Sequence, residues 1–306
     1  MKHSGISIVV CCYNSAQVIG DTLLALGALK LPADAYIELV LVNNNCTDRT
    51  VEVTLEVWNQ MGAPFPLRIV EARQPGLNFA RKAGVISANY EFVLFCDDDN
   101  WLSSDYAVNV IGAFESNPEL GIVGGWSVGK FEGTMPPWFP HVETAYAVGG
   151  EPPESVQPVS FVFGSAMAIR RELGMRIFEN NLTTLDRVGT VLTSGGDAEL
   201  CERCLAIGYS VAKLRSLRFT HFIKKERLTW SYCIRLFEGF SFSSAMRKGP
   251  AFSWRQKLSA MRIIVYFILT NPLVFWHAIR KTEGDLETIR YFSLQGTVKA
   301  MWLGRL

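Results

Sequence analysis

The sequence predicts an α/β fold built around a mostly parallel sheet, and three observations lead to this prediction. Short apolar runs alternate with stretches of helical spacing over roughly the first 125 residues. The loops after three of these runs are small and polar. One run of Phe, Val and Leu ends directly in three carboxylates. Strict alternation of strand and helix is typical of a doubly wound sheet with helices on both faces.

Each element of this sheet has its own signal. The apolar runs that predict strands are 6–10, 39–42, 67–70, 92–95 and 122–123. Between them, apolar residues recur at the three- and four-residue spacing of a helix. They are Val18, Leu23, Leu26 and Leu29, then Val51, Leu55 and Trp58, then Phe79, Ala83 and Ile86, and then Val110 and Phe114.

Polar loops follow the first, second and fourth predicted strands, at 12–15, 43–48 and 97–100. Ligands bind at the carboxyl ends of the strands in sheets of this kind. We therefore expect these three loops to converge on one crevice.

The acidic loop Asp97, Asp98 and Asp99 follows a strand that is too apolar to keep ionised carboxylates inside it. Crowded carboxylates repel one another unless a cation joins them, and hard oxygen ligands suit Mg²⁺ or Mn²⁺. An acidic turn, or a helix N-cap at Asp99 or Asn100, is the alternative interpretation.

Five short motifs follow one another along about residues 5 to 240. They are Val9-Val10-Cys11-Cys12-Tyr13-Asn14, Leu41-Val42-Asn43-Asn44-Asn45-Cys46-Thr47-Asp48-Arg49-Thr50, Ala80-Arg81-Lys82-Ala83-Gly84, Asp97-Asp98-Asp99 and Gly195-Gly196-Asp197-Ala198-Glu199-Leu200. In this order and spacing the sequence resembles family 2 glycosyltransferases.

The resemblance implies a GT-A fold and transfer of a sugar, with inversion, from a nucleotide diphosphate donor. The sequence departs from the family pattern at two positions. Asn43 stands where an Asp that contacts the base is common, and Gly196 stands where a Glu usually precedes the catalytic Asp. The Gln-x-x-Arg-Trp segment of processive synthases is not found in the sequence, which favours addition of one sugar.

The resemblance also implies which residues bind the donor, and we expect a UDP-sugar there. The expected residues are Cys12, Tyr13, Asn14, Asn43, Asn44, Arg81, Asp97 and Asp98. The alternatives are a half-buried tyrosine at a strand end for Tyr13, a turn and helix cap for Asn43 and Asn44, and a solvated helix face for Arg81.

For the metal, the resemblance implies Mn²⁺ or Mg²⁺ held by Asp97 and Asp99, with His221 brought back to the metal or the diphosphate. A structural histidine is the alternative for His221. Asp197 precedes a helical pattern and, by resemblance, is the general base that accepts the proton of the acceptor hydroxyl. A plain helix N-cap is its alternative.

The C-terminal part of the chain differs in composition from the rest. Residues 251–306 hold eight Lys and Arg against three Asp and Glu, a net of +5, whereas the whole chain has a net charge of +1. The apolar, aromatic stretch 262–279 is short for a membrane span and is broken at Asn271 and Pro272. It fits a helix lying in the membrane interface or a hairpin packed on the catalytic domain.

We therefore divide the chain into a catalytic domain at 1–245 and a basic, helical, membrane-associated tail at 246–306. No secretory signal precedes the first strand, so we expect a cytoplasmic protein, peripheral on the cytoplasmic face of the membrane. Seven cysteines lie mostly in or beside apolar segments, which indicates reduced thiols.

The predicted activity is metal-dependent, inverting transfer of one sugar to a saccharide or lipid-linked saccharide, with a role in cell-envelope polysaccharide synthesis and no nucleic-acid partner. A non-catalytic protein that binds sugar nucleotides or glycans is the alternative from another class. A nucleotide-sugar pyrophosphorylase is a further one, but its Gly-rich, basic loop is missing after the first strand, where Cys11-Cys12-Tyr13-Asn14 stands.

Overall fold

The structure is a computed structural model, and it describes residues 5–149, 156–184, 186–187, 192–248, 252–280 and 282–303. It divides into two compact units. The sheet unit comprises Met1–Lys130, Ala147–Leu182 and Gly196–Phe222, and the helical unit comprises Phe131–Tyr146, Thr183–Gly195 and Ile223–Leu306.

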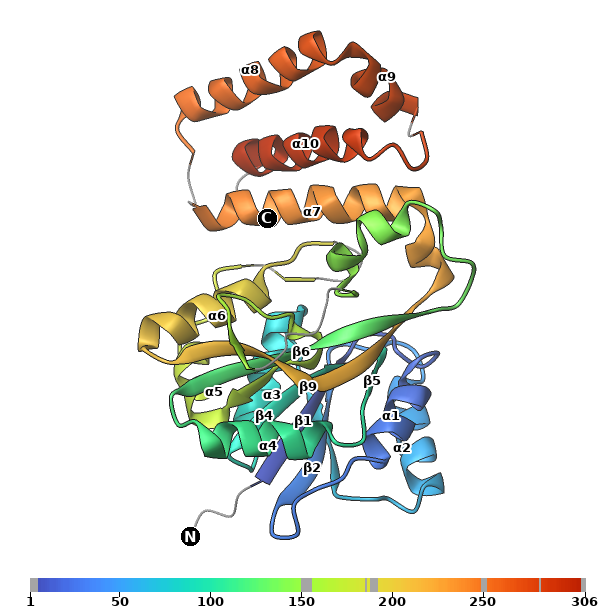
Figure 1. Cartoon of the computed structure of the whole chain (residues 1–306), viewed down its shortest axis with the longest axis vertical. Coiled ribbons are helices and arrows are strands. Elements are labelled where there is room, and N and C mark those ends of the chain that lie inside the picture. The colour runs from blue at the N-terminus through green and yellow to red at the C-terminus, as the bar shows by residue number, and fades with distance from the viewer. Residues whose placement is uncertain are drawn as a thin grey trace. The chain divides into compact units, whose positions relative to one another are not determined.

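Strands and helices alternate along the first part of the chain, as the apolar spacing predicts (Figure 1). The strands are β1 (Gly5–Cys12), β2 (Tyr36–Asn43), β3 (Leu67–Glu71), β4 (Phe92–Asp97), β5 (Asn100–Leu102), β6 (Leu120–Phe131), β7 (Gln157–Pro158), β8 (Ala168–Arg170) and β9 (Ser210–Ile223). The helices are α1 (Ile19–Gly27), α2 (Thr50–Gln60), α3 (Leu77–Ser87), α4 (Tyr106–Ser116), α5 (Arg171–Phe178), α6 (Gly196–Ile207), α7 (Trp230–Lys248), α8 (Trp254–Thr270), α9 (Pro272–Arg280) and α10 (Glu287–Leu303).

The strands form one sheet in the order β3-β2-β1-β4-β8-β6-β9-β5, with β7 paired to β9. The first four of these pair in parallel. Strand β8 is antiparallel to both β4 and β6, and β9 is antiparallel to both β5 and β7. The strand expected at 122–123 is the start of the longer β6, which continues beyond its short pairing with β8. Very short strands such as β5 and β8 have too few residues to show a period, so the sequence did not indicate them.

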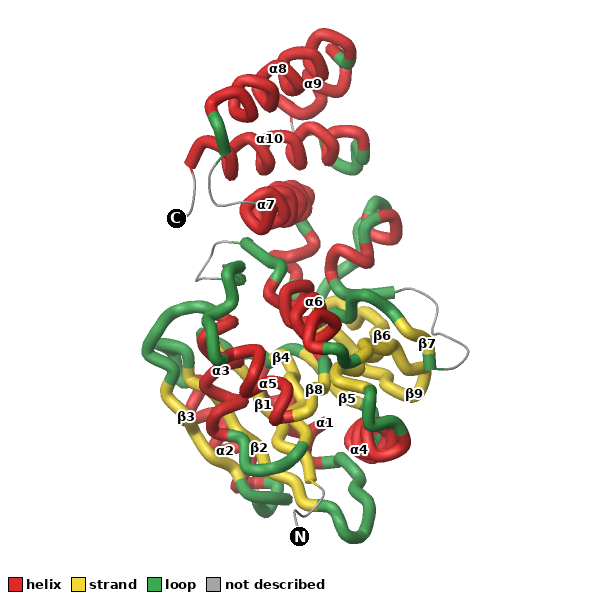
Figure 2. The backbone as a smooth tube through the Cα atoms, turned by 90° about the vertical axis from the view of Figure 1, so that its left-hand side faces the viewer, coloured by secondary structure: helices red, strands yellow, loops and turns green. Residues whose placement is uncertain are grey.

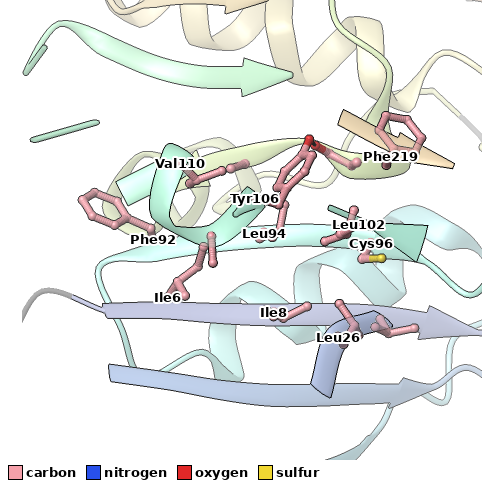
Figure 3. Packing of buried hydrophobic residues seen from close by; sticks show 14 of the residues in the cluster. Ile6, Ile8, Leu26, Phe92, Leu94, Cys96, Leu102, Tyr106, Val110 and Phe219 are labelled. Atoms are coloured by element: carbon pink, nitrogen blue, oxygen red, sulfur yellow. Dashed lines mark hydrogen bonds between the residues drawn. The ribbon is translucent and has the colours of Figure 1, made fainter. Parts of the chain in front are cut away.

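Helices cover both faces of the sheet, which confirms the predicted arrangement (Figures 1 and 2). Alternate residues of a strand point to opposite faces, so Ile6 and Ile8 belong to one apolar cluster and Val9 to the other. The first cluster includes residues of α1, α2 and α4, and the second includes residues of α3, α5 and α6. Figure 3 shows Tyr106 of α4 packed over this first face of the sheet.

A buried carboxylate stabilises the sheet at the opposite end from the polar loops. Glu38 of β2 is only 2% exposed. Its oxygens accept hydrogen bonds from Ser7 Oγ (2.6 Å), from the Asn89 backbone N–H (2.7 Å) and from Arg68 Nη2 (2.8 Å). Burial by itself would raise the pKa of Glu38, but these hydrogen bonds and the guanidinium charge outweigh it and lower the pKa.

We expect Glu38→Gln to lower the free energy of unfolding by about 2 kcal/mol at about pH 7, because the Arg68 guanidinium loses its charged partner. A lowered folded-state pKa stabilises the fold above the usual carboxyl pKa of 4.5 and stops doing so as the pH falls below it. The difference between parent and variant should therefore shrink at about pH 4. Denaturant unfolding at both pH values measures this, with the exposed Glu179→Gln as control; equal stability of parent and Glu38→Gln would contradict it.

In the helical unit, α10 contacts α7, α8 and α9, and Figures 1 and 2 show it between α7 and the α8–α9 pair. A capping box at Ser253 and Gln256 starts α8. The helix ends at Thr270 and α9 begins at Pro272, so the predicted break at Asn271 and Pro272 is confirmed. Within the described residues, no single helix has the length and apolar character of a membrane span. Together α8 and α9 do, but they are bent by 99°.

The division of the chain into two compact units differs from the division at residue 245 that the sequence suggested. Helix α7 crosses residue 245 and belongs to the helical unit from its first residue. Two earlier segments, 131–146 and 183–195, belong to that unit as well. The compact units do not show which residues catalysis needs, so the division into a catalytic domain and a tail at residue 245 stays a prediction.

Candidate active site

The carboxyl ends of β1, β2 and β4 lie level with one another. In the register of the parallel strands, Cys12 pairs with Asn43 and Cys11 pairs with Asp97. The loops that follow these strands therefore start from one edge of the sheet. This is the edge at which a doubly wound sheet binds its ligands.

The loops after β1 and β2 are hydrogen-bonded to each other. Asn14 has a left-handed backbone (φ 57°), which Asn tolerates better than most residues. Its side-chain Oδ1 accepts a hydrogen bond from the Thr47 backbone N–H at 2.7 Å. In return, Asp48 Oδ2 accepts one from the Ala16 backbone N–H at 3.0 Å. Between these anchors Tyr13 is 49% exposed, so its ring is available to a ligand.

The side chains of Asn43 and Asn44 both make hydrogen bonds within the protein. Asn43 Nδ2 donates to both carboxylate oxygens of Glu71 at 3.0 and 3.1 Å. Asn44 is buried and donates to the carbonyls of Ala72 (2.7 Å) and Gln74 (2.8 Å), while its Oδ1 accepts from the Gly76 backbone N–H (2.9 Å). Asn44 thus shapes the loop before α3. A role for these two asparagines at the donor stays a prediction.

Cysteine thiols near this edge are held in the neutral form. Cys12 and Cys96 are buried, and burial raises the pKa of both thiols well above the ordinary value. Burial and the nearby Asp97 raise the pKa of Cys11 to about 12, although Arg81 opposes this. A neutral thiol is a poor nucleophile and a poor metal ligand. The predicted contact of Cys12 with the donor is not tested.

The three aspartates after β4 have different surroundings. Asp97 ends the strand. Asp98 accepts a hydrogen bond from the Ser15 hydroxyl, and its carbonyl accepts one from Thr22 Oγ1 at 2.7 Å. Asp98 therefore ties the acidic loop to the loop after β1 and to α1. This anchoring role was not expected for Asp98, whose predicted contact with the donor remains a prediction.

Asp99 faces His221, with 3.5 Å between Oδ2 and Nε2. The backbone fixes this pair, because Asn100 of β5 pairs with His221 of β9 and the Phe222 N–H donates to the Asp99 carbonyl at 2.8 Å. Strand β9 continues past His221 to Ile223 because it pairs with β5 at this point. Asp99 and His221 thus come together from segments more than a hundred residues apart, while their role as metal ligands stays a prediction.

The side chains at Asp99 fit a metal ion that takes some of its ligands from the protein and the others from substrate phosphates and water. Within the described residues, no group of three or more His, Cys, Asp or Glu side chains is placed to hold a metal ion. Mg²⁺ is usually bound through one or two carboxylates together with substrate phosphates and waters, and Mn²⁺ accepts similar ligands. Two buried atoms, Oδ1 of Asn100, which follows Asp99, and Oγ of Ser165, whose carbonyl accepts from Asn100 Nδ2, have no hydrogen-bond partner within the described residues. Asp97, Asp99 and His221 are the residues that would hold such a metal.

Asp197 is the second residue of α6, and its carboxylate is held from two sides. Oδ1 lies 2.6 Å from Arg81 Nη1, and Oδ2 accepts a hydrogen bond from the Gly164 backbone N–H at 2.8 Å. The Arg81 side chain is 3% exposed and the Asp197 side chain is 25% exposed. Arg81 thus lies inside the protein and reaches Asp197 from α3, which excludes the solvated helix face considered for it.

Position 164 has no room for a side chain in this arrangement. A Cβ atom at position 164 would lie 2.3 Å from both Arg81 Nη2 and Asp197 Oδ1, closer than real Cβ contacts. The next residue, Ser165, accepts a hydrogen bond at its carbonyl from Asn100 Nδ2 at 2.7 Å. One short turn, η3 (Gly164–Ala166), therefore contacts both Asp197 and the residue that follows Asp99.

Sequence reasoning missed the bond from Gly164 to Asp197 and the tie between Ser15 and Asp98. The small residues around Gly164 were a usable signal, since close backbone approach needs them. The sequence around Asp98 does not indicate its partner, because Ser15 lies 83 residues away.

Comparison with known proteins shows the family of the chain. The sequence model described as "Glycosyl transferase family 2" matches residues 7–178, which is more than half of the chain. The poly-beta-1,6-N-acetyl-D-glucosamine synthase of Staphylococcus epidermidis is 30% identical over 122 residues, covering 40% of this chain and 28% of that protein. The corresponding synthase of Staphylococcus aureus strain COL is 30% identical over 121 residues, with the same shares. The chain thus matches little more than a quarter of these relatives.

Solved structures with low sequence identity share the fold. The mannosyltransferase PcManGT from Pyrobaculum calidifontis, in complex with GDP-Man and Mn²⁺, matches with a TM-score of 0.64 at 17% identity, over 100% of this chain and 89% of that one. TarS 1–349 of S. aureus, in complex with UDP, matches with a TM-score of 0.54 at 13% identity, over 98% and 90%. The predicted GT-A fold with a helical C-terminal region is confirmed. The chain belongs to glycosyl transferase family 2.

Proposed function

We propose that this protein is an inverting glycosyltransferase that moves one sugar from a nucleotide diphosphate donor to a saccharide or lipid-linked saccharide. The observation that carries this proposal is the single turn η3, which contacts Asp197 on one side and Asn100, next to Asp99, on the other. A carboxylate suited to accept a proton is thereby fixed in relation to a carboxylate–imidazole pair suited to a metal.

Asp197 is the proposed general base. In the proposed reaction the acceptor oxygen forms a bond to the anomeric carbon, the bond from that carbon to the diphosphate oxygen breaks, and the acceptor's proton passes to Asp197. Arg81 and the Gly164 N–H orient the carboxylate. Arg81 was predicted to contact the donor, and we propose instead that it is a positioning residue for Asp197.

Donor binding is proposed at the ends of β1, β2 and β4. The exposed ring of Tyr13 provides a face on which a nucleobase can stack. Two structural neighbours were solved with UDP and with UDP-GlcNAc, and another with GDP-Man. A UDP-sugar remains the proposed donor.

Asp97, Asp99 and His221 are the proposed metal ligands, with Mn²⁺ or Mg²⁺ shared with the diphosphate. Such a cation would neutralise the charge that develops on the departing nucleoside diphosphate. PcManGT was solved in complex with Mn²⁺, which makes Mn²⁺ the first cation to test.

An enzyme that uses a lipid-linked acceptor would lie peripherally at the cytoplasmic face of a membrane. Its proposed role there is in cell-envelope polysaccharide synthesis. The decisive experiment is incubation of the purified protein with a panel of nucleotide sugars and Mn²⁺, followed by detection of released nucleoside diphosphate. Turnover of one donor supports the enzyme. Donor binding with no turnover, with or without glycan and lipid-linked acceptors, would favour a non-catalytic binding protein.

We expect Asp99→Asn to weaken Mn²⁺-dependent donor binding by roughly ten-fold or more, because a neutral amide is a weaker ligand than a carboxylate. Titration calorimetry with and without EDTA measures this effect. The exposed Asp34→Asn, which removes the same charge elsewhere, is the control and should bind donor like the parent. If the parent binds its donor equally well in EDTA, the metal assignment is wrong.

A further inference from the structure

One side of α8 is apolar and exposed along its whole length. Trp254, Leu258, Met261, Val265 and Leu269 follow one another at intervals of four, three, four and four residues, so they share one side of the helix. Their exposed fractions are 66, 40, 45, 52 and 74%. An isolated exposed apolar residue is common, but a continuous row of large ones marks an interaction surface.

The same character continues on α9 after the bend. Leu273, Trp276 and Ile279 recur at three-residue spacing and are 73, 46 and 63% exposed. We define the α8–α9 face by the eight residues of the two rows, Trp254, Leu258, Met261, Val265, Leu269, Leu273, Trp276 and Ile279. In Figures 1 and 2 both helices lie on the side of α10 away from α7.

Cations and a tyrosine lie beside this face. Arg255 and Arg262 are both exposed and seven residues apart, so they share the side of α8 next to the apolar row. Tyr266, one turn further, is 70% exposed. On α9, Arg280 lies over the Trp276 ring at 3.8 Å from its centroid. Neither helix contains an Asp or Glu.

The charge decides between possible occupants of the face. An apolar row with aromatic residues and exposed arginines at its border is typical of helices that lie in a membrane interface. Anionic headgroups attract Lys and Arg there, while the apolar side chains enter the acyl boundary. A second copy of this chain would bring the same cations against each other and repel them.

Lying flat suits the helices better than crossing. With 17 residues α8 is about 26 Å long, which is short of the roughly 30 Å hydrocarbon core. Arg262 stands near its middle, and the chain turns by 99° before α9. Ala260 of α8 is buried in the helical unit, where α8 contacts α10.

We propose that the α8–α9 face docks the protein on the surface of a bilayer that contains anionic lipid. This proposal concerns binding alone and does not depend on the proposed transfer reaction. It specifies the side chains that enter the interface and the cations that select the lipid.

The test is cosedimentation of the full chain with vesicles of phosphatidylcholine alone and with vesicles that also contain phosphatidylglycerol. We expect binding to the anionic vesicles and at least ten-fold weaker binding to the neutral ones. The double variant Val265→Glu, Leu269→Glu should bind the anionic vesicles at least ten-fold more weakly than the parent. The matched control Ile263→Glu, Thr270→Glu adds the same charge at exposed positions on the side of α8 opposite the apolar row, and it should bind more tightly than the first variant.

A further double variant keeps the test valid if charges in the apolar row prevent folding. Arg255→Gln, Arg262→Gln leaves the row intact and should weaken binding to anionic vesicles several-fold, with a smaller dependence on salt. Equal binding of parent protein to both kinds of vesicle, or to neither, would overturn the proposal. So would a dimer in sedimentation that Val265→Glu, Leu269→Glu dissociates while the parent does not bind vesicles, because a second copy would then cover the face.

Discussion

Asp197→Asn should lower the rate of sugar transfer by roughly 10²-fold or more while donor and metal affinity persist. The amide keeps the size of the side chain, but it cannot take the proton that the acceptor hydroxyl loses. Turnover with the donor found in the panel, together with calorimetric donor affinity, measures both quantities.

The same substitution should also cost stability, by about 1–3 kcal/mol. The reason is the nearly buried Arg81, whose guanidinium would face a neutral amide in place of a carboxylate. An Asp that only capped α6 would behave differently, because Asn caps a helix about as well and less than ~1 kcal/mol would be lost. Melting temperatures of the parent and the variant separate these cases. Parental turnover in Asp197→Asn would remove Asp197 from the mechanism.

Gly164→Ala should reduce turnover by about 10²-fold without removing any charged group. The new methyl would lie 2.3 Å from Arg81 Nη2 and from Asp197 Oδ1, so the turn or the ion pair must shift. A displacement of the base by about 1 Å is enough for a loss of this size. Donor affinity should change less, because the donor is proposed to bind at the ends of other elements.

Gly112→Ala in α4 is the matched control. A Cβ at position 112 has nothing within 4 Å, so the alanine should raise stability by roughly 0.5–1 kcal/mol and leave turnover unchanged. If Gly164→Ala retains parental turnover, the close contact of η3 with Asp197 has no part in catalysis. If it fails to fold where Gly112→Ala folds, the contact is required for stability instead.

The sequence predicted the regular part of the fold because its signals are local. The runs at 6–10 and 92–95 and the helices between them follow from the spacing of apolar residues, and the crevice follows from where their loops begin. The partners within the site were not predictable in the same way. Arg81 and Asp197 lie 116 residues apart, and nothing near either residue in the sequence indicates the other.

Most of the other features that the sequence did not predict are short strands and buried polar residues. The three residues of β8 and of β5 are too few for a period, yet β5 determines where His221 stands. Glu38 sits inside a strand that is otherwise apolar, and only the folded arrangement reveals that Ser7, Arg68 and Asn89 surround it. Asn44 matched a family motif, but its hydrogen bonds show that it supports the loop before α3.

The turn η3 also has a thermodynamic consequence. Its first residue bonds to Asp197 and its second to Asn100, so neither centre can shift without moving a backbone that the other shares. If a bound donor shifts Asn100, we expect the shift to reach Asp197, the proposed base. An acceptor that displaces Asp197 should then act back on the donor by the same free energy. Donor and acceptor affinities should therefore be linked, so that each ligand reports on the presence of the other.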